Sequence, residues 1–150
     1  MNKEYYYFAY GANLNLQGME SRCPGFKKVA PAILYNYKLV FRGVADVAPA
    51  KGDAVMGAVY LLTKEHFAAL DRFEGFPHLY LRKVVEVETL SGKKLTAIVY
   101  VMTKKSKPRP PSASYLNIII QGLQQWRLSE SYQSELIEQA ESLQTAVTEK

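Results

Sequence analysis

Residues 70–77 read LDRFEGFP, and this stretch places an acidic residue where a helix pattern calls for an apolar one. Counting forward from Leu70 at helical spacing, the next inward position is Glu74. Gly75 favours the left-handed conformation that ends a helix, and Pro77 cannot continue one. We therefore predict that Glu74 points inward from the last turn of a helix.

A carboxyl group at this position has two interpretations. Flanked by Phe73 and Phe76, it would lose part of its hydration, and its pKa would rise toward the range in which it can both give and take a proton. The alternative is a helix-end ion pair with Arg72 or Arg82 at the surface. The stretch alone favours this ion pair over catalysis.

The composition predicts one compact domain over residues 1–150. With 48% hydrophobic residues, a chain of this length holds one core and is too short for two. Cys23 is the single cysteine, so no intrachain disulfide is possible and a reducing, cytoplasmic location is expected. The thiol, next to Pro24, is interpreted as buried and structural. No apolar run is long enough to span a bilayer or to form a signal-peptide core, so no membrane association is expected.

The charged and metal-binding side chains indicate neither a nucleic-acid partner nor a metal site. The formal net charge is +5, and much of the excess lies in the proline-interrupted stretch 104–109. A solvated basic loop is favoured there over an anion or nucleic-acid surface, because no nucleic-acid motif accompanies it. His66, His78 and Cys23 have unrelated spacings, so no metal and no cofactor are expected.

The N-terminal segment predicts a strand that delivers a small-residue loop. Residues 5–10 are rich in aromatics and are followed by Gly-Ala-Asn-Leu-Asn at 11–15. Converging backbone N–H groups in such a loop can hold a carboxylate or phosphate oxygen. An ordinary strand-to-helix turn is the alternative.

The rest of the chain predicts an α+β domain with a small, mainly antiparallel, barrel-like sheet and flanking helices. Pro31 and Pro49 indicate edges or bulges, and Thr63 and Ser112 are expected helix N-caps. Six or so short strands are expected, with a frayed tail at 145–150. Further strands are predicted at 29–35, 38–42, 54–62, 80–89 and 95–102, and helices at 16–22, from Thr63 to Glu74, from Ser112 to Trp126 and at 131–143.

The strand at 80–89 brings further candidates toward Glu74. Alternation puts Leu81, with Val85 and Val87, on one face and Tyr80 and Arg82 on the other. Tyr80, Arg82 and Tyr100 are therefore candidates for lining a pocket. Packing in the core or on the sheet surface is an equal alternative for each of them.

Three separated segments together resemble the gamma-glutamyl cyclotransferase-like family. They are YFAYGANL at 7–14, LDRFEG at 70–75 with Tyr80 and Arg82 behind it, and PSASYL at 111–116. The resemblance covers the chain up to about residue 128. It implies a small barrel-like fold with a cavity and an enzyme that converts a gamma-glutamyl amine or related amide to 5-oxoproline and free amine.

The resemblance also implies the site residues. The substrate-binding loop is carried over to Tyr10, Gly11, Ala12, Asn13 and Leu14, the acid and base to Glu74, and a lining tyrosine to Tyr115. With the resemblance added, catalysis by Glu74 is favoured over the surface ion pair. Ala12 departs from the family, which often has Ser at this position. If backbone N–H groups bind the substrate, the missing hydroxyl lowers substrate affinity little. If the hydroxyl makes its own hydrogen bond to the substrate, its loss lowers the affinity by about 1 kcal/mol.

The resemblance also gives expectations about the class of substrate and about the partners. The helix-break region looks closer to the branch acting on gamma-glutamylamines, and to bacterial members of unknown substrate, than to the glutathione-pathway branch. The expected partner is a small gamma-glutamyl molecule, and the chain is expected to be a monomer or weak homodimer. A binding module that keeps the cavity without turnover is the alternative, and an anion or nucleic-acid binder using residues 104–109 is a further, less favoured one.

Overall fold

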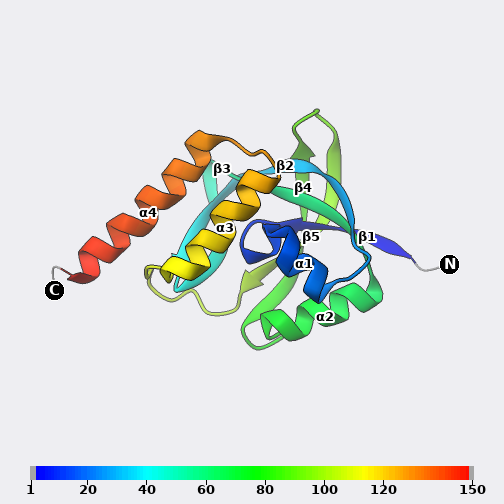
Figure 1. The fold of residues 1–150 in the computed structure, drawn as a ribbon, viewed down its shortest axis with the longest axis horizontal. Helices are drawn as coiled ribbons and strands as arrows, with labels where there is room; N and C mark the ends of the chain where they lie inside the picture. Colours follow the sequence, from blue (N-terminus) through cyan, green and yellow to red (C-terminus); the bar gives the residue numbers. More distant parts are fainter. Residues whose placement is uncertain (1–2, 149–150) are drawn as a thin grey trace.

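Residues 3–148 are described by the computed structural model, which has the expected α+β architecture (Figure 1). Its strands are β1 (Glu4–Ala9), β2 (Lys27–Arg42), β3 (Val44–Thr63), β4 (Tyr80–Thr89) and β5 (Lys94–Met102). Its helices are α1 (Leu16–Arg22), α2 (Lys64–Glu74), α3 (Ala113–Gln125) and α4 (Glu130–Thr148), with a short 3-10 turn, η1 (Ala12–Leu14). Within residues 3–148, none of the helices combines the length and the apolar character that a membrane crossing requires.

The sheet is a closed barrel in the order β1-β3-β2-β4-β5. Most neighbouring strands pair antiparallel, as expected. The barrel closes where β1 meets β5 in parallel, through the pair Tyr7 and Ile98. The loop that follows β1 therefore leaves directly from the seam of the barrel.

The strands between residues 27 and 63 differ from the prediction of several short ones. The described chain has two long strands, β2 and β3, joined at Gly43, whose φ of 84° only glycine adopts readily. Pro31 pairs with Ala58 beside one register shift, and Pro49 pairs with Tyr37 beside another. The predicted bulges are thus confirmed, but they bend the strands without ending them.

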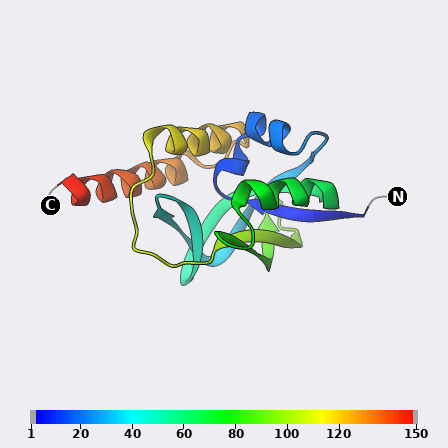
Figure 2. The same ribbon diagram turned by 90° about the horizontal axis from the view of Figure 1, so that it is seen from below.

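The helices form a layer against the barrel. Figure 2 shows α1, α3 and α4 together above the strands. The side chain of Trp126 reaches from the end of α3 to the carbonyl of Leu14, with Nε1 donating across 3.0 Å. Gly122 allows this approach, because a Cβ there would lie 2.7 Å from backbone atoms of Leu14 and Asn15. Helix α3 consequently fixes the loop that follows β1.

Helix α4 is longer than predicted. It runs from Glu130 to Thr148, whereas the sequence suggested 131–143 with fraying from Thr145. No glycine or proline follows Leu143, so nothing in that segment ends the helix early. Of the predicted tail, residues 149–150 lie outside the described residues.

Candidate active site

A cavity of about 220 Å³ opens at one end of the barrel, between η1, the end of α2 and the start of α3. Segments far apart in the sequence meet there. The lining residues are Tyr7, Tyr10, Gly11, Ala12, Asn13, Val44, Ala45, Phe73, Glu74, Leu79, Tyr80, Tyr100 and Tyr115.

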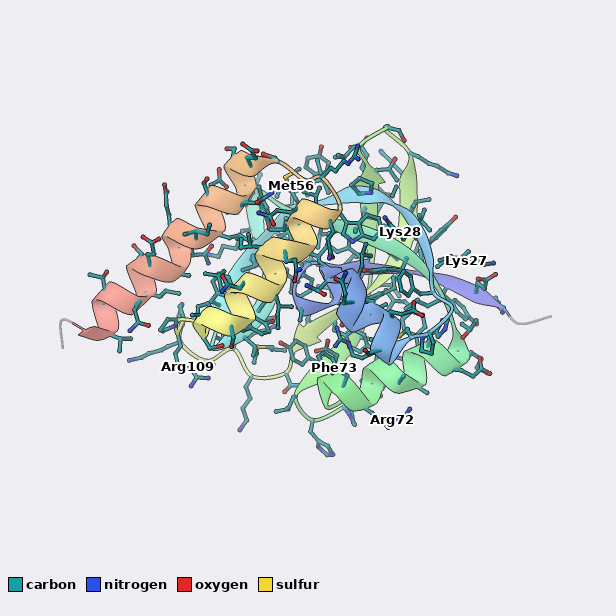
Figure 3. All side chains as sticks on the ribbon, in the orientation of Figure 1. Lys27, Lys28, Met56, Arg72, Phe73 and Arg109 are labelled. Carbon is teal, nitrogen blue, oxygen red and sulfur yellow. The ribbon has the colours of Figure 1, made fainter. Side chains whose placement is uncertain are left out.

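Glu74 reaches the cavity because of how α2 begins and ends. Thr63 caps the start, its side chain accepting from the N–H of His66 across 3.3 Å. The helix stops after Glu74 because Gly75 takes the left-handed conformation, with φ of 70°. In Figure 3, Phe73 lies on the inner side of α2 and Arg72 on its outer side. Both the cap and the inward carboxylate are as predicted.

The Glu74 carboxylate is held by an amide and has an unusual pKa. Asn13 Nδ2 donates to its Oε1 across 3.2 Å. Burial raises the pKa of Glu74 to about 7, although the charge of Arg22 and the Asn13 hydrogen bond act to lower it. A carboxyl group that titrates near neutrality can both accept and release a proton under physiological conditions.

Asn13 is itself fixed by two further residues. Its Nδ2 also donates to the Tyr7 hydroxyl across 2.8 Å, and its Oδ1 accepts from Arg22 Nε across 2.9 Å. The Arg22 guanidinium lies 4.0 Å from the centre of the Phe73 ring. Sequence reasoning missed Arg22, because nothing in its short helix marks it as a neighbour of Glu74.

The predicted loop residues line the cavity, with one exception. The cavity is lined by Tyr10, Gly11, Ala12 and Asn13. Leu14 does not line it, because its side chain is fully buried in the core. The Leu14 N–H donates to the Gly11 carbonyl across 3.0 Å, and that of Asn15 to the Ala12 carbonyl across 3.1 Å. Leu14 therefore anchors the loop to the core.

The candidates on β4 and β5 separate into lining and supporting residues. Tyr80 and Tyr100 line the cavity, and Tyr80 donates to the Ala45 carbonyl across 2.7 Å. Tyr80 is buried, and Leu81, on the other face of β4, is 43% exposed. The Ala45 carbonyl gives the inward hydroxyl of Tyr80 a partner.

Arg82 stays outside the cavity. Its Nε donates to Asp71 Oδ1 across 2.9 Å, and its guanidinium lies 5.3 Å from the ring centres of both Phe67 and Phe76. The Tyr100 hydroxyl also donates to Asp71 Oδ1, across 2.6 Å. Since Asp71 is the acid bound to Arg82, the alternative ion pair between Arg82 and Glu74 does not form.

Helix α3 contributes Tyr115 to the lining of the cavity. The Ser112 hydroxyl caps this helix by accepting from the Tyr115 N–H across 3.1 Å. The Tyr115 hydroxyl accepts from the N–H of Ala45 across 3.1 Å, and burial raises its pKa to about 12, so it stays protonated. It can therefore still donate a hydrogen bond toward a ligand.

The basic stretch 104–109 lies beside the cavity without lining it. Lys105 Nζ is 3.0 Å from Oδ2 of Asp46, a fully buried carboxylate that Arg42 Nε also contacts at 3.0 Å. Arg109 Nη2 donates to the Arg42 carbonyl across 3.0 Å. These contacts hold the stretch against the barrel and keep the adjacent Ala45 in place.

A family model described as gamma-glutamyl cyclotransferase, AIG2-like, matches residues 7–117. The chain belongs to this family. The gamma-glutamylcyclotransferase of Homo sapiens is 32% identical over an alignment that covers 89% of this chain and 78% of the human protein. Among solved structures, one titled gamma-glutamyl cyclotransferase is 31% identical with a TM-score of 0.83, covering 89% of this chain and 86% of that one. The chain is thus an enzyme of the gamma-glutamyl cyclotransferase family.

A third relative shares the fold. An AIG2-like protein of Mus musculus is 22% identical with a TM-score of 0.60, covering 75% of this chain and 82% of that one. The family description carries the AIG2-like name, and the curated human relative carries the name gamma-glutamylcyclotransferase.

Proposed function

We propose that this enzyme converts a gamma-glutamyl amide to 5-oxoproline and a free amine, with Glu74 as the single proton carrier. The observation that carries the proposal is the position of Glu74, which lines the cavity with a carboxylate held by Asn13 and a pKa of about 7. The name of the human relative supports the same reaction class.

The reaction needs no nucleophile from the protein. The alpha-amine of the substrate attacks its own gamma-carbonyl, which forms the new N–C bond of a five-membered ring. The bond from that carbon to the leaving nitrogen then breaks. Glu74 takes the proton that the alpha-amine loses and delivers it to the leaving nitrogen, so it ends the cycle in the state in which it began. Proton transfer of this kind typically accelerates a reaction 10²–10⁴-fold.

The loop after β1 would hold the substrate folded for this attack. Because η1 uses the N–H groups of Leu14 and Asn15 for its own hydrogen bonds, we assign the alpha-carboxylate to the N–H groups of Ala12 and Asn13, which open the turn. Tyr10 and Tyr115 complete this end of the cavity. Holding the amine against the carbonyl is catalysis by orientation, which is worth several kcal/mol.

Release of 5-oxoproline from gamma-glutamyl-epsilon-lysine, gamma-glutamyl-alanine and a gamma-glutamyl-alkylamine tests the proposal. We expect release from at least one of them by the wild type, and a loss of about 10²-fold or more in Glu74→Gln. Glu65→Gln, an exposed acid on the same helix, is the matched control and should keep full activity. Circular dichroism checks that both variants are folded.

Two results would count against the proposal. Equal activity of the wild type and Glu74→Gln would remove Glu74 from its role. A wild type that releases nothing but is stabilised against thermal unfolding by these compounds would instead support a binding module on the same fold.

A further inference from the structure

Ala45 binds the hydroxyl groups of two tyrosines that line the cavity. Its N–H donates to the Tyr115 hydroxyl across 3.1 Å, and its carbonyl accepts from the Tyr80 hydroxyl across 2.7 Å. Strand β1 pairs with residues 58–63 of β3, so at Ala45 these two side chains, rather than a neighbouring strand, bind the polar backbone groups. The position of Ala45 therefore determines where both hydroxyls lie.

The two bonds to Ala45 give the hydroxyls different roles toward a ligand. The Tyr115 oxygen accepts from Ala45, so its proton is available to a ligand, whereas Tyr80 donates its proton to Ala45 and offers a lone pair. A Cβ built on Gly11 would lie 3.4 Å both from the Ala45 Cβ and from the Tyr115 hydroxyl. A displacement of Ala45 would therefore move both hydroxyls and the contact with the loop after β1.

The next residue, Asp46, is a fully buried carboxylate that three donors contact. Arg42 Nε and Lys105 Nζ each lie 3.0 Å from its Oδ2. The N–H of Met102 donates to its Oδ1 across 2.9 Å. These donors come from β2, from the loop after β5 and from the end of β5 itself. Asp46 therefore ties the part of β3 that holds Ala45 to three other segments.

Stability alone does not account for a buried cluster of charges. Taking the charges out of water costs free energy that their attraction only partly recovers, and apolar residues of similar size often stabilise a fold equally well. The cluster does fix a geometry, because a shift of the chain would leave a buried charge without its partner. The geometry that Asp46 fixes is that of the adjacent Ala45.

We propose that Asp46 is a positioning residue for the reaction, holding Ala45 so that the hydroxyls of Tyr80 and Tyr115 stay in place around the substrate. This step rests on the proposed function, because turnover is what the two hydroxyls serve. Asp46 does not line the cavity, so its effect on turnover passes through Ala45.

Lys105 allows a test that leaves the core intact, because its side chain is 48% exposed. Lys105→Met removes one cation from Asp46 and should lower kcat/KM about threefold for the best of the three gamma-glutamyl substrates. Lys105→Arg keeps the cation and should recover most of this loss. Lys27→Met is the matched control, since Lys27 pairs with Glu4 at the surface, and it should keep full activity. In Figure 3, Lys27 lies on the opposite side of the molecule from Arg109, which belongs to the loop that carries Lys105.

A double-mutant cycle tests whether Asp46 acts through the hydroxyls. Asp46→Asn keeps the shape of the side chain without its charge, and we expect it to lower kcat/KM about tenfold. In Tyr115→Phe, where one hydroxyl is already absent, the same substitution should lower kcat/KM by only about threefold. If Asp46→Asn does not fold, Lys105→Met takes its place in the cycle and should likewise lose part of its effect.

The amide resonance of Ala45 provides a measurement that does not depend on turnover. Tyr115→Phe removes the acceptor of the Ala45 N–H, so its NMR spectrum gives the shift of that amide when the hydrogen bond is lost. Lys105→Met and Asp46→Asn should move the Ala45 resonance in the same direction.

Three results would count against the assignment. Equal losses of kcat/KM with and without the Tyr115 hydroxyl would reduce Asp46 to a structural residue. An Ala45 resonance that stays in place in the Asp46 and Lys105 variants would do the same, and in both cases the cyclotransferase reaction would stand. If the wild type releases no 5-oxoproline from any substrate, the proposed function fails, and the role of Asp46 in turnover fails with it.

Discussion

Asn13 joins the loop after β1 to the end of α2 through a single hydrogen bond to Glu74, with 3.2 Å between Nδ2 and Oε1. The amide can present only one of its two ends to the carboxylate, and Arg22 determines which, because its Nε donates to Asn13 Oδ1. The residue proposed to move the proton and the loop proposed to hold the substrate are therefore placed relative to one another by these contacts.

The first prediction concerns the pH dependence of turnover. Glu74 must be ionised to take a proton from the substrate amine, and its pKa is raised to about 7. We expect kcat/KM to rise with pH to a plateau, with the midpoint of the acid limb near that value. The substrate amine titrates at higher pH, which titration of the free compound determines separately. A midpoint at the ordinary pKa of a glutamic acid would contradict the prediction.

The second prediction is that Glu74 lowers the stability of the fold at neutral and alkaline pH. Its pKa is raised in the folded state from 4.5 to about 7, so its contribution is most favourable below the unfolded pKa and is lost as pH rises through the folded one. Glu74→Gln should therefore raise the free energy of unfolding at about pH 8 by roughly 3 kcal/mol, and the gain should shrink toward about pH 5. Urea unfolding at the two pH values measures it. A gain that does not change with pH would assign the effect to packing.

The third prediction identifies Arg22 as a positioning residue. Arg22→Gln should reduce kcat/KM about tenfold, because Asn13 loses the donor that fixes its orientation. It should also move the acid limb of the pH profile upward, since the charge of Arg22 lowers the pKa of Glu74. Arg22→Lys keeps the charge and should leave the limb close to its wild-type position. A loss of thermal stability with an unmoved limb in Arg22→Gln would indicate a structural role alone.

The fourth prediction concerns Ala12, where the family resemblance leads us to expect a serine. If the N–H groups of Ala12 and Asn13 bind the substrate carboxylate, a hydroxyl at position 12 adds little, and Ala12→Ser should change KM by less than about twofold. Steady-state kinetics on the preferred substrate measures this. A fall in KM of about fivefold, corresponding to about 1 kcal/mol, would show that a serine hydroxyl makes its own hydrogen bond.

The fifth prediction concerns the contact between α3 and the loop. Gly122→Ala places a Cβ 2.7 Å from the backbone of Leu14 and Asn15, so the helix or the loop must move. We expect a loss of about 1–3 kcal/mol in stability together with a fall in kcat/KM. Gln124→Ala, an exposed site on the same helix, should change neither. A variant with wild-type stability and activity would show that the loop tolerates displacement.

The parts of the fold that depend on local chemistry were predictable from the sequence. Helix α2 begins at a cap, Thr63, and ends where Gly75 takes a positive φ, and both signals are side-chain properties that act within a few residues. The same reasoning placed Glu74 inward. The length of β2 and β3 was not predictable in this way. In the sequence, Pro31 and Pro49 indicate strand ends, whereas in the structure the pairing of β2 with β3 continues on both sides of each register shift.

The site was predictable only in so far as its residues belong to recognisable segments. Tyr10, Asn13, Glu74 and Tyr115 were found through such segments, and all four line the cavity. Val44, at the start of β3, and Leu79, just before β4, also line the cavity, although neither belongs to one of those segments. Arg22 supports the site from α1, and the position of this helix depends on contacts with segments that are distant in the sequence.

The seam of the barrel has a consequence for how this enzyme could be used. In the barrel, β1 closes beside β5 (Figure 1). The cavity therefore exists only when lining segments from Tyr7 to Tyr115 are assembled. The turn between β4 and β5 holds Gly92, around which there is open space, and it divides the lining into a part before it and a part containing Tyr100 and Tyr115. Of two fragments cut at this turn, the first would lack Tyr100 and Tyr115, and the second would lack Glu74 and the other lining residues. Fused to a pair of interacting proteins, they would form a split reporter in which release of 5-oxoproline signals that the two partners have met.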